Sequence, residues 1–297
     1  MTPTPPSLWR RHRGWIWPAL FLTPGLALFG VVIIASSVQS LWISLFDWDG
    51  VGPMTWVGLG NYRELFSDPQ FYVTLKNNAI WLGMFMLAPP IGLAIALLLN
   101  QPIRGMRLAK SLFFVPLVLA SVAVGIVFSW VYTPTFGLLA LVFRAFGATA
   151  PALLSDERWV TVAVVLAALW PQVAFCMVLY LAGLNTLDED LAGAGRVDGA
   201  KGWRMLRHVV LPQLTPITLI AVAVTVVGAL RSFDMVAVMT QGGPFGSSTV
   251  LAYEMYEQSI FSYRFGYGAA IASVLFAVMV VFIAWYLSRI LRAEARG

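Results

Sequence analysis

The sequence predicts an all-α, polytopic membrane protein with six transmembrane helices. Of its 297 residues, 59% are hydrophobic and only 11% are charged, whereas a soluble domain carries about 25% charged residues. The apolar residues gather into runs, each with the roughly 20 residues that a helix needs to cross about 30 Å of hydrocarbon. These runs are apolar on all faces, so lipid can surround them. We expect them to be helical, because a helix satisfies all of its backbone hydrogen bonds internally where no water is available. The composition excludes an ordinary water-soluble enzyme.

The three predicted spans of the first half cover about residues 15–45, 72–99 and 111–132. A Pro-rich and then basic tail, 1–14, precedes the first span, which is too long for the core of a cleaved signal peptide and is therefore a retained helix. The polar segment 46–71 contains Asp-Gly and Gly-Pro turns and a short interfacial helix over 61–66. Pro89 and Pro90 predict a kink within the second span.

The three predicted spans of the second half cover about residues 159–184, 213–239 and 267–291. A long loop with several Gly and Pro residues, 133–158, precedes the fourth span. A polar, basic loop, 188–212, separates the fourth span from the fifth. The predicted transmembrane domain therefore extends over 15–291 and ends in a short basic tail, 292–297.

Positively charged residues predict the orientation, because Lys and Arg accumulate on the cytoplasmic side of membrane proteins. They concentrate in the two tails, in the loop after the second span and in the 188–212 loop. These residues are Arg10, Arg11, Arg13, Arg104, Arg107, Lys110, Arg196, Lys201, Arg204, Arg207, Arg289, Arg292 and Arg296. Both termini are therefore expected in the cytoplasm. The net charge of +5 is explained by this bias and requires no nucleic-acid partner.

The sequence predicts no catalytic residue, metal site or cofactor in this chain. Its one cysteine, Cys176, excludes an intrachain disulfide. The two histidines, His12 and His208, lie in no metal-ligand pattern. Lys201 is followed by Gly202 rather than Ser or Thr, so the segment is not a phosphate-binding loop and should not bind ATP. No nucleophile–base motif is present.

The 188–212 loop carries the most informative pattern. Asp198 is placed to cap a helix over 199–207, and Pro212 marks the start of the fifth span. One interpretation is a solvated loop that its charge keeps in the cytoplasm. The spacing favours another: x-Ala-x, three residues, Gly, nine residues, an aliphatic residue, one residue, Leu-Pro. The matching residues are Gly193, Ala194, Gly195, Gly199, Val209, Leu211 and Pro212.

This spacing resembles the EAA loop of bacterial ABC importer permeases. In that family the loop holds the coupling helix, which docks in a groove of a cytoplasmic ATPase. The resemblance implies an ATPase-coupling role for Gly193, Ala194, Gly195, Asp198, Gly199, Leu211 and Pro212. The sequence departs from the family at Gly193, where a Glu is usual, and at Gly195, where a second Ala is usual. Glu189 or Asp190 is a candidate substitute for that carboxylate.

Four other segments resemble the carbohydrate-type branch of these permeases, that of the maltose and glycerol-phosphate systems. They cover residues 56–71, 92–105, 108–125 and 239–270. The resemblance implies the type I ABC importer permease fold, in a bacterial cytoplasmic (inner) membrane. It also implies three kinds of partner besides lipid: a second, homologous permease, two cytoplasmic ATPase subunits that bind ATP and Mg, and an extracytoplasmic solute-binding protein. The expected function is translocation of a sugar or related solute.

Ionisable residues within a span are candidates for a transport pathway. Arg231 and Asp234 are three residues apart, so on one helix they would share a face and pair. They either line the pathway or only neutralise each other. The resemblance adds solute-facing positions in the fourth and fifth spans, namely Trp170, Gln172, Phe175, Gly228, Ala229 and Ser232. Packing against lipid or a partner helix remains open for Trp170.

An ion-gradient-driven secondary transporter is the alternative function. Arg231 and Asp234 would then be its ion-coupled pair. The chain is short for that class and has no internal repeat of the kind such transporters show.

Overall fold

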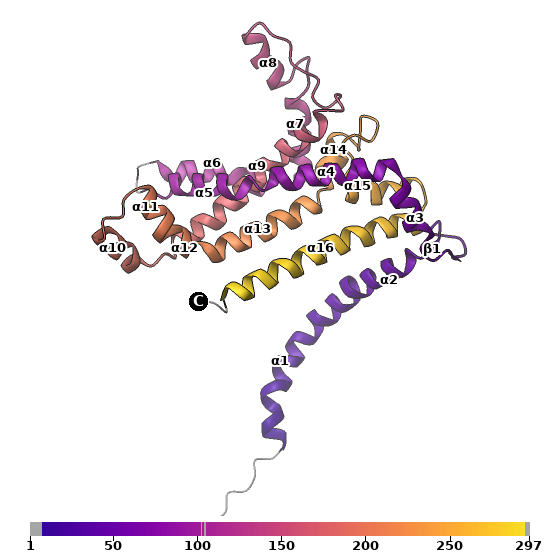
Figure 1. Ribbon diagram of the computed structural model, residues 1–297, viewed down its shortest axis with the longest axis horizontal. Helices are drawn as coiled ribbons and strands as arrows, with labels where there is room; N and C mark the ends of the chain where they lie inside the picture. The colour runs from indigo at the N-terminus through magenta and orange to yellow at the C-terminus, as the bar shows by residue number, and fades with distance from the viewer. Residues whose placement is uncertain (1–7, 102, 104, 295–297) are drawn as a thin grey trace, which may run out of the picture.

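The computed structural model describes residues 8–101, 103 and 105–294. Parts of the two predicted tails, 1–7 and 295–297, and Arg104 of the basic loop lie outside these residues. Figure 1 shows a bundle of long helices that run side by side. They are α4 (Pro69–Phe85), α5 (Ala88–Leu99), α9 (Val160–Leu184), α13 (Thr215–Leu230) and α16 (Phe265–Glu294).

The core lies where α9 crosses α5. A Cβ at Gly92 would come within 2.6 Å of Cys176 Cβ and 2.7 Å of Met177 N, so only glycine allows the two helices to approach this closely. Trp81, Met177 and Tyr180 fill the space around the crossing and are buried. The helix α9 is apolar on all faces and sits in the centre of the bundle.

Four helical stretches are long and apolar enough to cross a membrane, and two bent helix pairs meet the same test. The single stretches are Pro18–Ile43, Pro69–Leu99, Val160–Leu184 and Phe265–Arg289. The bent pairs are Met106–Val118 with Ser121–Val131, at 101°, and Trp203–Gln213 with Thr215–Leu230, at 73°. The described residues thus hold four spans, or six if each bent pair is one span. The predicted helical, polytopic architecture is confirmed.

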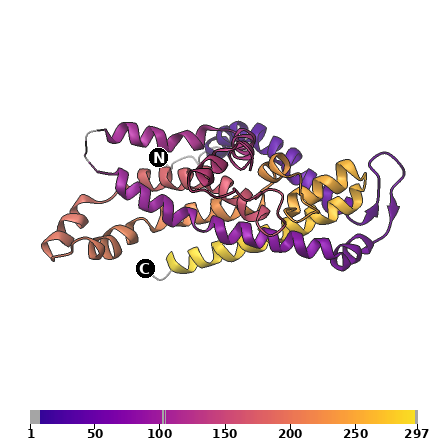
Figure 2. The same cartoon turned by 90° about the horizontal axis from the view of Figure 1, so that it is seen from above.

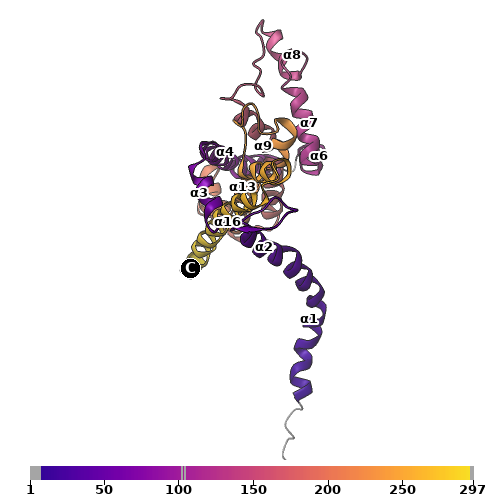
Figure 3. The same ribbon diagram turned by 90° about the vertical axis from the view of Figure 1, so that its right-hand side faces the viewer.

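The first span is one continuous helical stretch made of α1 (Leu8–Phe29), the π-helical η1 (Gly30–Ala35) and α2 (Ser36–Ile43). The helix begins at Leu8, within the segment predicted as a tail. The end-on view of Figure 3 shows α1 pointing away from the bundle. None of the residues in its most apolar window is buried.

The third predicted span, 111–132, is broken in its middle. It divides into α6 (Met106–Val118) and α7 (Ser121–Val131), because Leu119 and Ala120 adopt extended backbone conformations. The predicted loop 133–158 also contains a helix, α8 (Leu138–Ala145). Figure 1 shows α7 and α8 projecting from one side of the bundle.

The interruption predicted from Pro89 and Pro90 is present. The helix α4 ends at Phe85, and both prolines lie in the first turn of α5, where a missing N–H leaves no carbonyl unpaired. The predicted short helix is α3 (Gly60–Ser67). A hairpin of β1 (Phe46–Asp47) and β2 (Thr55–Trp56) precedes it and was not predicted.

The fifth predicted span, 213–239, contains two breaks. It comprises the end of α12 (Leu211–Gln213), then α13, then α14 (Asp234–Met239). Two groups of short elements lie at opposite ends of the bundle (Figures 1 and 2). One end holds α10 (Glu189–Val197), α11 (Trp203–Met205) and the π-helical η2 (Leu206–Val210). The other holds the hairpin, α3, α15 (Leu251–Tyr256) and the π-helical η3 (Glu257–Phe261).

Candidate functional site

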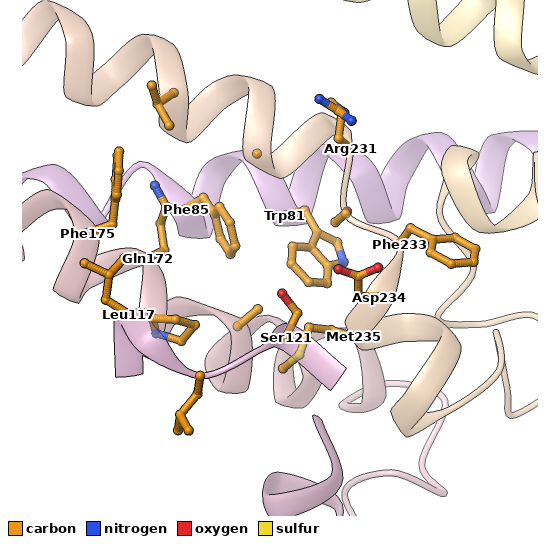
Figure 4. A pocket seen from close by; sticks show the side chains of 16 residues that line it. Trp81, Phe85, Leu117, Ser121, Gln172, Phe175, Arg231, Phe233, Asp234 and Met235 are labelled. Atoms are coloured by element: carbon orange, nitrogen blue, oxygen red, sulfur yellow. The ribbon is translucent and has the colours of Figure 1, made fainter. Parts of the chain in front are cut away.

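A cavity of about 330 Å³ lies between α4, α9, the α6–α7 break and the end of α13 (Figure 4). Two interrupted helices meet there, one broken at Leu119 and Ala120 and the other between Leu230 and Asp234. Within the membrane, non-helical backbone is tolerated where it is buried in protein or lines a water-filled space. The breaks therefore mark this cavity as a place where polar groups are accessible within the bundle.

Six of the eight residues predicted for the solute pathway line this cavity. They are Gln172, Phe175, Gly228, Arg231, Ser232 and Asp234. Trp170 does not line it: its ring packs 5.8 Å from that of Phe128, and 42% of the residue is exposed. Ala229 does not line it either, because it is fully buried in the bundle.

The predicted pairing of Arg231 with Asp234 on one helix face is wrong. The helix α13 ends at Leu230, Arg231 is its C-cap, and a new helix begins at Asp234. Figure 4 shows the Arg231 guanidinium pointing away from the Asp234 carboxylate. Their sequence separation produces a shared face only in an unbroken helix, so the ion-coupled pair of the alternative function is not formed among the described residues.

Among the described residues, some polar side chains of the cavity have hydrogen-bond partners and others do not. Gln172 Nε2 donates to Thr225 Oγ1 at 2.9 Å, and Ser232 Oγ donates to the Ala229 carbonyl at 2.8 Å. The buried Trp81 Nε1, by contrast, has no hydrogen-bond partner in the described part of the chain.

Sequence reasoning missed several cavity residues, including Trp81, Phe85, Ser121 and Phe233. The sequence offered one signal for two of these residues: Trp81 and Phe85 are four residues apart, which places both rings on the same face of a helix.

The 188–212 loop is built on a capped helix. The Asp188 carboxylate accepts from Asp190 N at 2.8 Å and Leu191 N at 3.4 Å, which starts α10. At its other end, Ala200 N donates to Gly195 O at 2.8 Å and Gly199 N to Arg196 O at 3.1 Å. With Gly199 at φ +80°, these two bonds form a Schellman motif. The predicted cap is therefore wrong: Asp198 is the C-cap of α10 and does not begin a helix over 199–207.

The two departures from the EAA pattern have different structural contexts. A Cβ at Gly195 would meet Val209 Cγ2 at 2.9 Å, so a second Ala there would require the Val209 side chain or η2 to shift. A Cβ at Gly193 would meet nothing within 4 Å. The chain therefore has open space for the usual Glu at 193, whereas the usual Ala at 195 requires a local rearrangement.

The surface of the 188–212 loop is both basic and apolar. Leu191, Val197 and Trp203 are exposed, Val197 by 88%. Ala194, Asp198 and Pro212 are also exposed, as are four basic residues: Arg196, Lys201, Arg204 and Arg207. Leu211 is half-buried at the start of α12. Large apolar side chains at the solvent-facing end of a membrane protein indicate a docking surface.

The 240–250 loop at the opposite end is fixed to the bundle. Asn77 Nδ2 donates to Ser247 O at 2.7 Å and to Thr249 O at 2.8 Å, and Gln70 Nε2 donates to Gly246 O at 2.9 Å. Asn78 Oδ1 accepts from Leu251 N at 2.9 Å, which caps α15 from α4. These amides satisfy loop carbonyls and N–H groups that have no helical partner.

Glu254 on α15 lies beneath this loop and is 2% exposed. Neither of its carboxyl oxygens has a hydrogen-bond partner in the described residues. Burial raises the pKa of this carboxyl above its ordinary value, and the charges of Asp68 and Glu257 raise it further. The acid therefore keeps its proton to a higher pH in the folded protein than in the unfolded chain.

Comparison with known proteins identifies the family. Residues 88–293 match the model of the binding-protein-dependent transport system inner membrane component. The chain is 33% identical over 281 residues to a probable ABC transporter permease protein of Pyrococcus horikoshii, covering 93% of this chain and 96% of that protein. It is 31% identical to the alpha-glucoside transport system permease protein AglF of Rhizobium meliloti, covering 91% and 81%.

A solved structure has the same fold. One chain in the crystal structure of a bacterial ABC transporter involved in the import of the acidic polysaccharide alginate superposes with a TM-score of 0.83 and 19% identity. The match covers 96% of this chain and 98% of that chain. The family match and the two permease relatives show that this chain belongs to the inner membrane components of binding-protein-dependent transport systems. It is the non-catalytic permease subunit of an ABC importer.

Proposed function

We propose that the chain carries a sugar or related solute, delivered by an external binding protein, through the cavity between α4, α9 and α13. Similar permeases are named for alpha-glucoside and lactose transport, and a crystal structure with the same fold is that of an alginate transporter in complex with an alginate-bound periplasmic protein. The cavity supports this class of solute because aromatic rings and polar side chains lie together on its walls. Sugars present apolar faces and hydroxyl edges that match such a lining.

The 188–212 loop is proposed to dock on cytoplasmic ATPases, two of which would bind ATP and Mg. The support is its exposed apolar side chains, its four basic residues and the Schellman turn that fixes the end of α10. Closure of the ATPase dimer would then move α10 and, through the bend at Leu214, α13 and the cavity wall. The proposed coupling residues are those named from the sequence, with Asp198 and Gly199 acting as the helix end rather than as a helix start.

A second, homologous permease is proposed to complete the pathway. The helix α1 extends from the bundle with no buried residue in its apolar window, which leaves a long surface for a partner subunit or for lipid. The proposed domain extends over 15–291, in a bacterial inner membrane.

Both termini are proposed to lie in the cytoplasm, because Lys and Arg concentrate at the end of the bundle that holds α10. Single cysteines at Lys201 and Phe245 test this orientation in intact cells. The native Cys176 is buried and provides the unlabelled background. We expect a membrane-impermeant maleimide to label position 245 and not 201; labelling of 201 from outside would reverse the orientation.

Reconstitution tests the function. The complete complex is placed in proteoliposomes and supplied with its binding protein and with ¹⁴C-labelled maltose, lactose or trehalose. We expect uptake that needs both ATP and the binding protein. Uptake driven by an ion gradient without ATP would support the secondary-transporter alternative, and ATP-driven uptake of other solutes alone would overturn the proposed solute class.

A further inference from the structure

Trp81 presents an unpaired hydrogen-bond donor to the cavity. The side chain lies on α4, is 1% exposed and packs against Phe85 with ring centroids 5.2 Å apart. Its Nε1 is buried and has no hydrogen-bond partner among the described residues. Figure 4 shows the indole nitrogen directed toward the part of the cavity where the Asp234 carboxylate and the Ser121 hydroxyl also point.

The three groups have complementary hydrogen-bonding capacities. An indole N–H only donates, an ionised carboxylate only accepts, and a serine hydroxyl does both. Leaving a buried donor unpaired destabilises a protein, so this corner of the cavity is incomplete without a further polar group. That group must accept a hydrogen bond from Trp81 and donate one to Asp234.

A hydroxyl meets both requirements at a single oxygen atom. An ammonium donates but does not accept, so it would leave the indole N–H unpaired. A carboxylate or sulfate accepts but does not donate, and it would be repelled by Asp234. The Arg231 guanidinium also lines the cavity but points away from this corner (Figure 4).

Two other polar side chains of the cavity are already engaged, and a third, that of Arg231, also lines the cavity. Gln172 Nε2 is bonded to Thr225, and Ser232 Oγ donates to a backbone carbonyl. Phe85 and Phe175 supply aromatic surface nearby. Among the described residues of the lining, Trp81 Nε1 is the buried polar atom without a partner, and the side chains of Ser121 and Asp234 point toward it.

We propose that Trp81, Ser121 and Asp234 form a hydroxyl-recognition site that selects neutral, hydroxyl-bearing solutes over anionic ones. The solute hydroxyl accepts from Trp81 Nε1 and donates to the Asp234 carboxylate, and the Ser121 hydroxyl completes its bonding. This inference rests on the proposed sugar transport and names the residues and the solute group that set its specificity.

The test compares Trp81→Phe with Trp170→Phe in the reconstituted complex. Both changes remove an indole N–H and keep an aromatic ring, but Trp170 lies outside the cavity lining. The solutes are whichever of ¹⁴C-maltose, lactose or trehalose the wild type takes up, and its monodeoxy analogues. Loss of one neutral hydrogen bond corresponds to a roughly 2- to 10-fold change.

We expect the wild type to prefer the parent sugar over one of its deoxy analogues by roughly that factor, and Trp81→Phe to abolish the preference. Trp170→Phe should retain it. If Trp81→Phe does not assemble, the test uses Ser121→Ala, provided that this variant is obtained at normal yield. Ser121→Ala should then reduce the preference for the parent sugar over its deoxy analogue. If the assembled variant shows the same ratio of parent-sugar to deoxy-sugar uptake as the wild type, the inference is wrong, although sugar uptake still supports the proposed function. If the wild type takes up no sugar at all, both the inference and the proposed function are wrong.

A second arm tests the charge of the site. Asp234→Asn keeps the size of the side chain and removes its negative charge. We expect uptake of a uronic-acid analogue of the transported sugar to rise relative to the neutral sugar. If the ratio of anionic to neutral uptake does not change, Asp234 does not face the solute and the proposed site is wrong.

Discussion

The 240–250 loop and the 188–212 loop both contain left-handed glycines, yet their backbones are supported in different ways. Side chains of α4 and α9 hydrogen-bond directly to the 240–250 loop. The hydrogen bonds of the described residues in the 188–212 loop reach only that loop itself and the start of the next helix, up to Thr215. The first loop is anchored to the bundle by side chains of other helices, whereas the second is held by its own hydrogen bonds and by those to the start of the next helix.

This difference predicts that the 240–250 loop contributes more to the stability of the isolated subunit. Replacing Asn77 by Ala removes two bonds to buried carbonyls and an acceptor for Thr161. We expect a loss of about 2–4 kcal/mol, measured by thermal unfolding in detergent. The control, Gln70→Ala, removes one bond from a half-buried side chain and should cost about 1 kcal/mol or less. Equal losses would mean that the loop is not anchored through Asn77.

Within the 188–212 loop, only the side of α10 that faces η2 is tightly packed. Gly195→Val inserts atoms where Val209 Cγ2 already lies, and we expect a loss of about 1–3 kcal/mol. Gly193→Glu enters open space and should change unfolding by less than about 0.5 kcal/mol. The same thermal measurement compares the two variants. A large loss for Gly193→Glu would contradict the exposed position of that face.

The buried carboxyl of Glu254, on the helix that follows the 240–250 loop, predicts that stability depends on pH. Unfolded Glu254 loses its proton near its ordinary pKa of 4.5, whereas the folded group keeps it to higher pH. Stability should therefore fall as pH rises above 4.5, by about 1.4 kcal/mol per pH unit, until the folded carboxyl ionises. Glu254→Gln should be more stable than wild type in this window and show a flatter profile. Identical profiles for the two proteins would show that folding does not raise the pKa of Glu254.

Much of the fold was predictable because a membrane span has a simple physical requirement, namely a long apolar helix. The errors cluster where helices break. Apolar composition does not reveal that Leu119 and Ala120 turn extended, or that α13 stops at Leu230, because both breaks depend on packing around a cavity between distant helices. Missing the second break produced the incorrect Arg231–Asp234 pair.

The candidate sites were predictable to different degrees. The 188–212 loop is contiguous, so its spacing was visible in the sequence, although the role of Asp198 depended on whether Gly199 ends or begins a helix. The cavity is assembled from α4, α7, α9 and α13. Trp81 and Ser121 were missed because nothing local relates them to Asp234.

Two glycines allow the coupling role of the 188–212 loop to be tested with a matched control. Gly147 ends α8 as Gly199 ends α10: Ala148 N donates to Phe143 O and Gly147 N to Arg144 O, each at 2.9 Å. Gly147 has φ +70° and Gly199 has φ +80°, and a Cβ on either would meet no atom within 4 Å. A valine at either position carries the same kind of backbone strain, but only Gly199 lies in the proposed docking surface.

The most direct measurement is therefore co-purification with the ATPase, followed by solute-stimulated ATP hydrolysis, for Gly199→Val beside Gly147→Val. We expect Gly199→Val to weaken ATPase association or to uncouple hydrolysis from uptake, while Gly147→Val behaves as wild type and both variants insert in the membrane. Normal association and normal coupled uptake in Gly199→Val would show that the 188–212 loop does not transmit the motion of the ATPase.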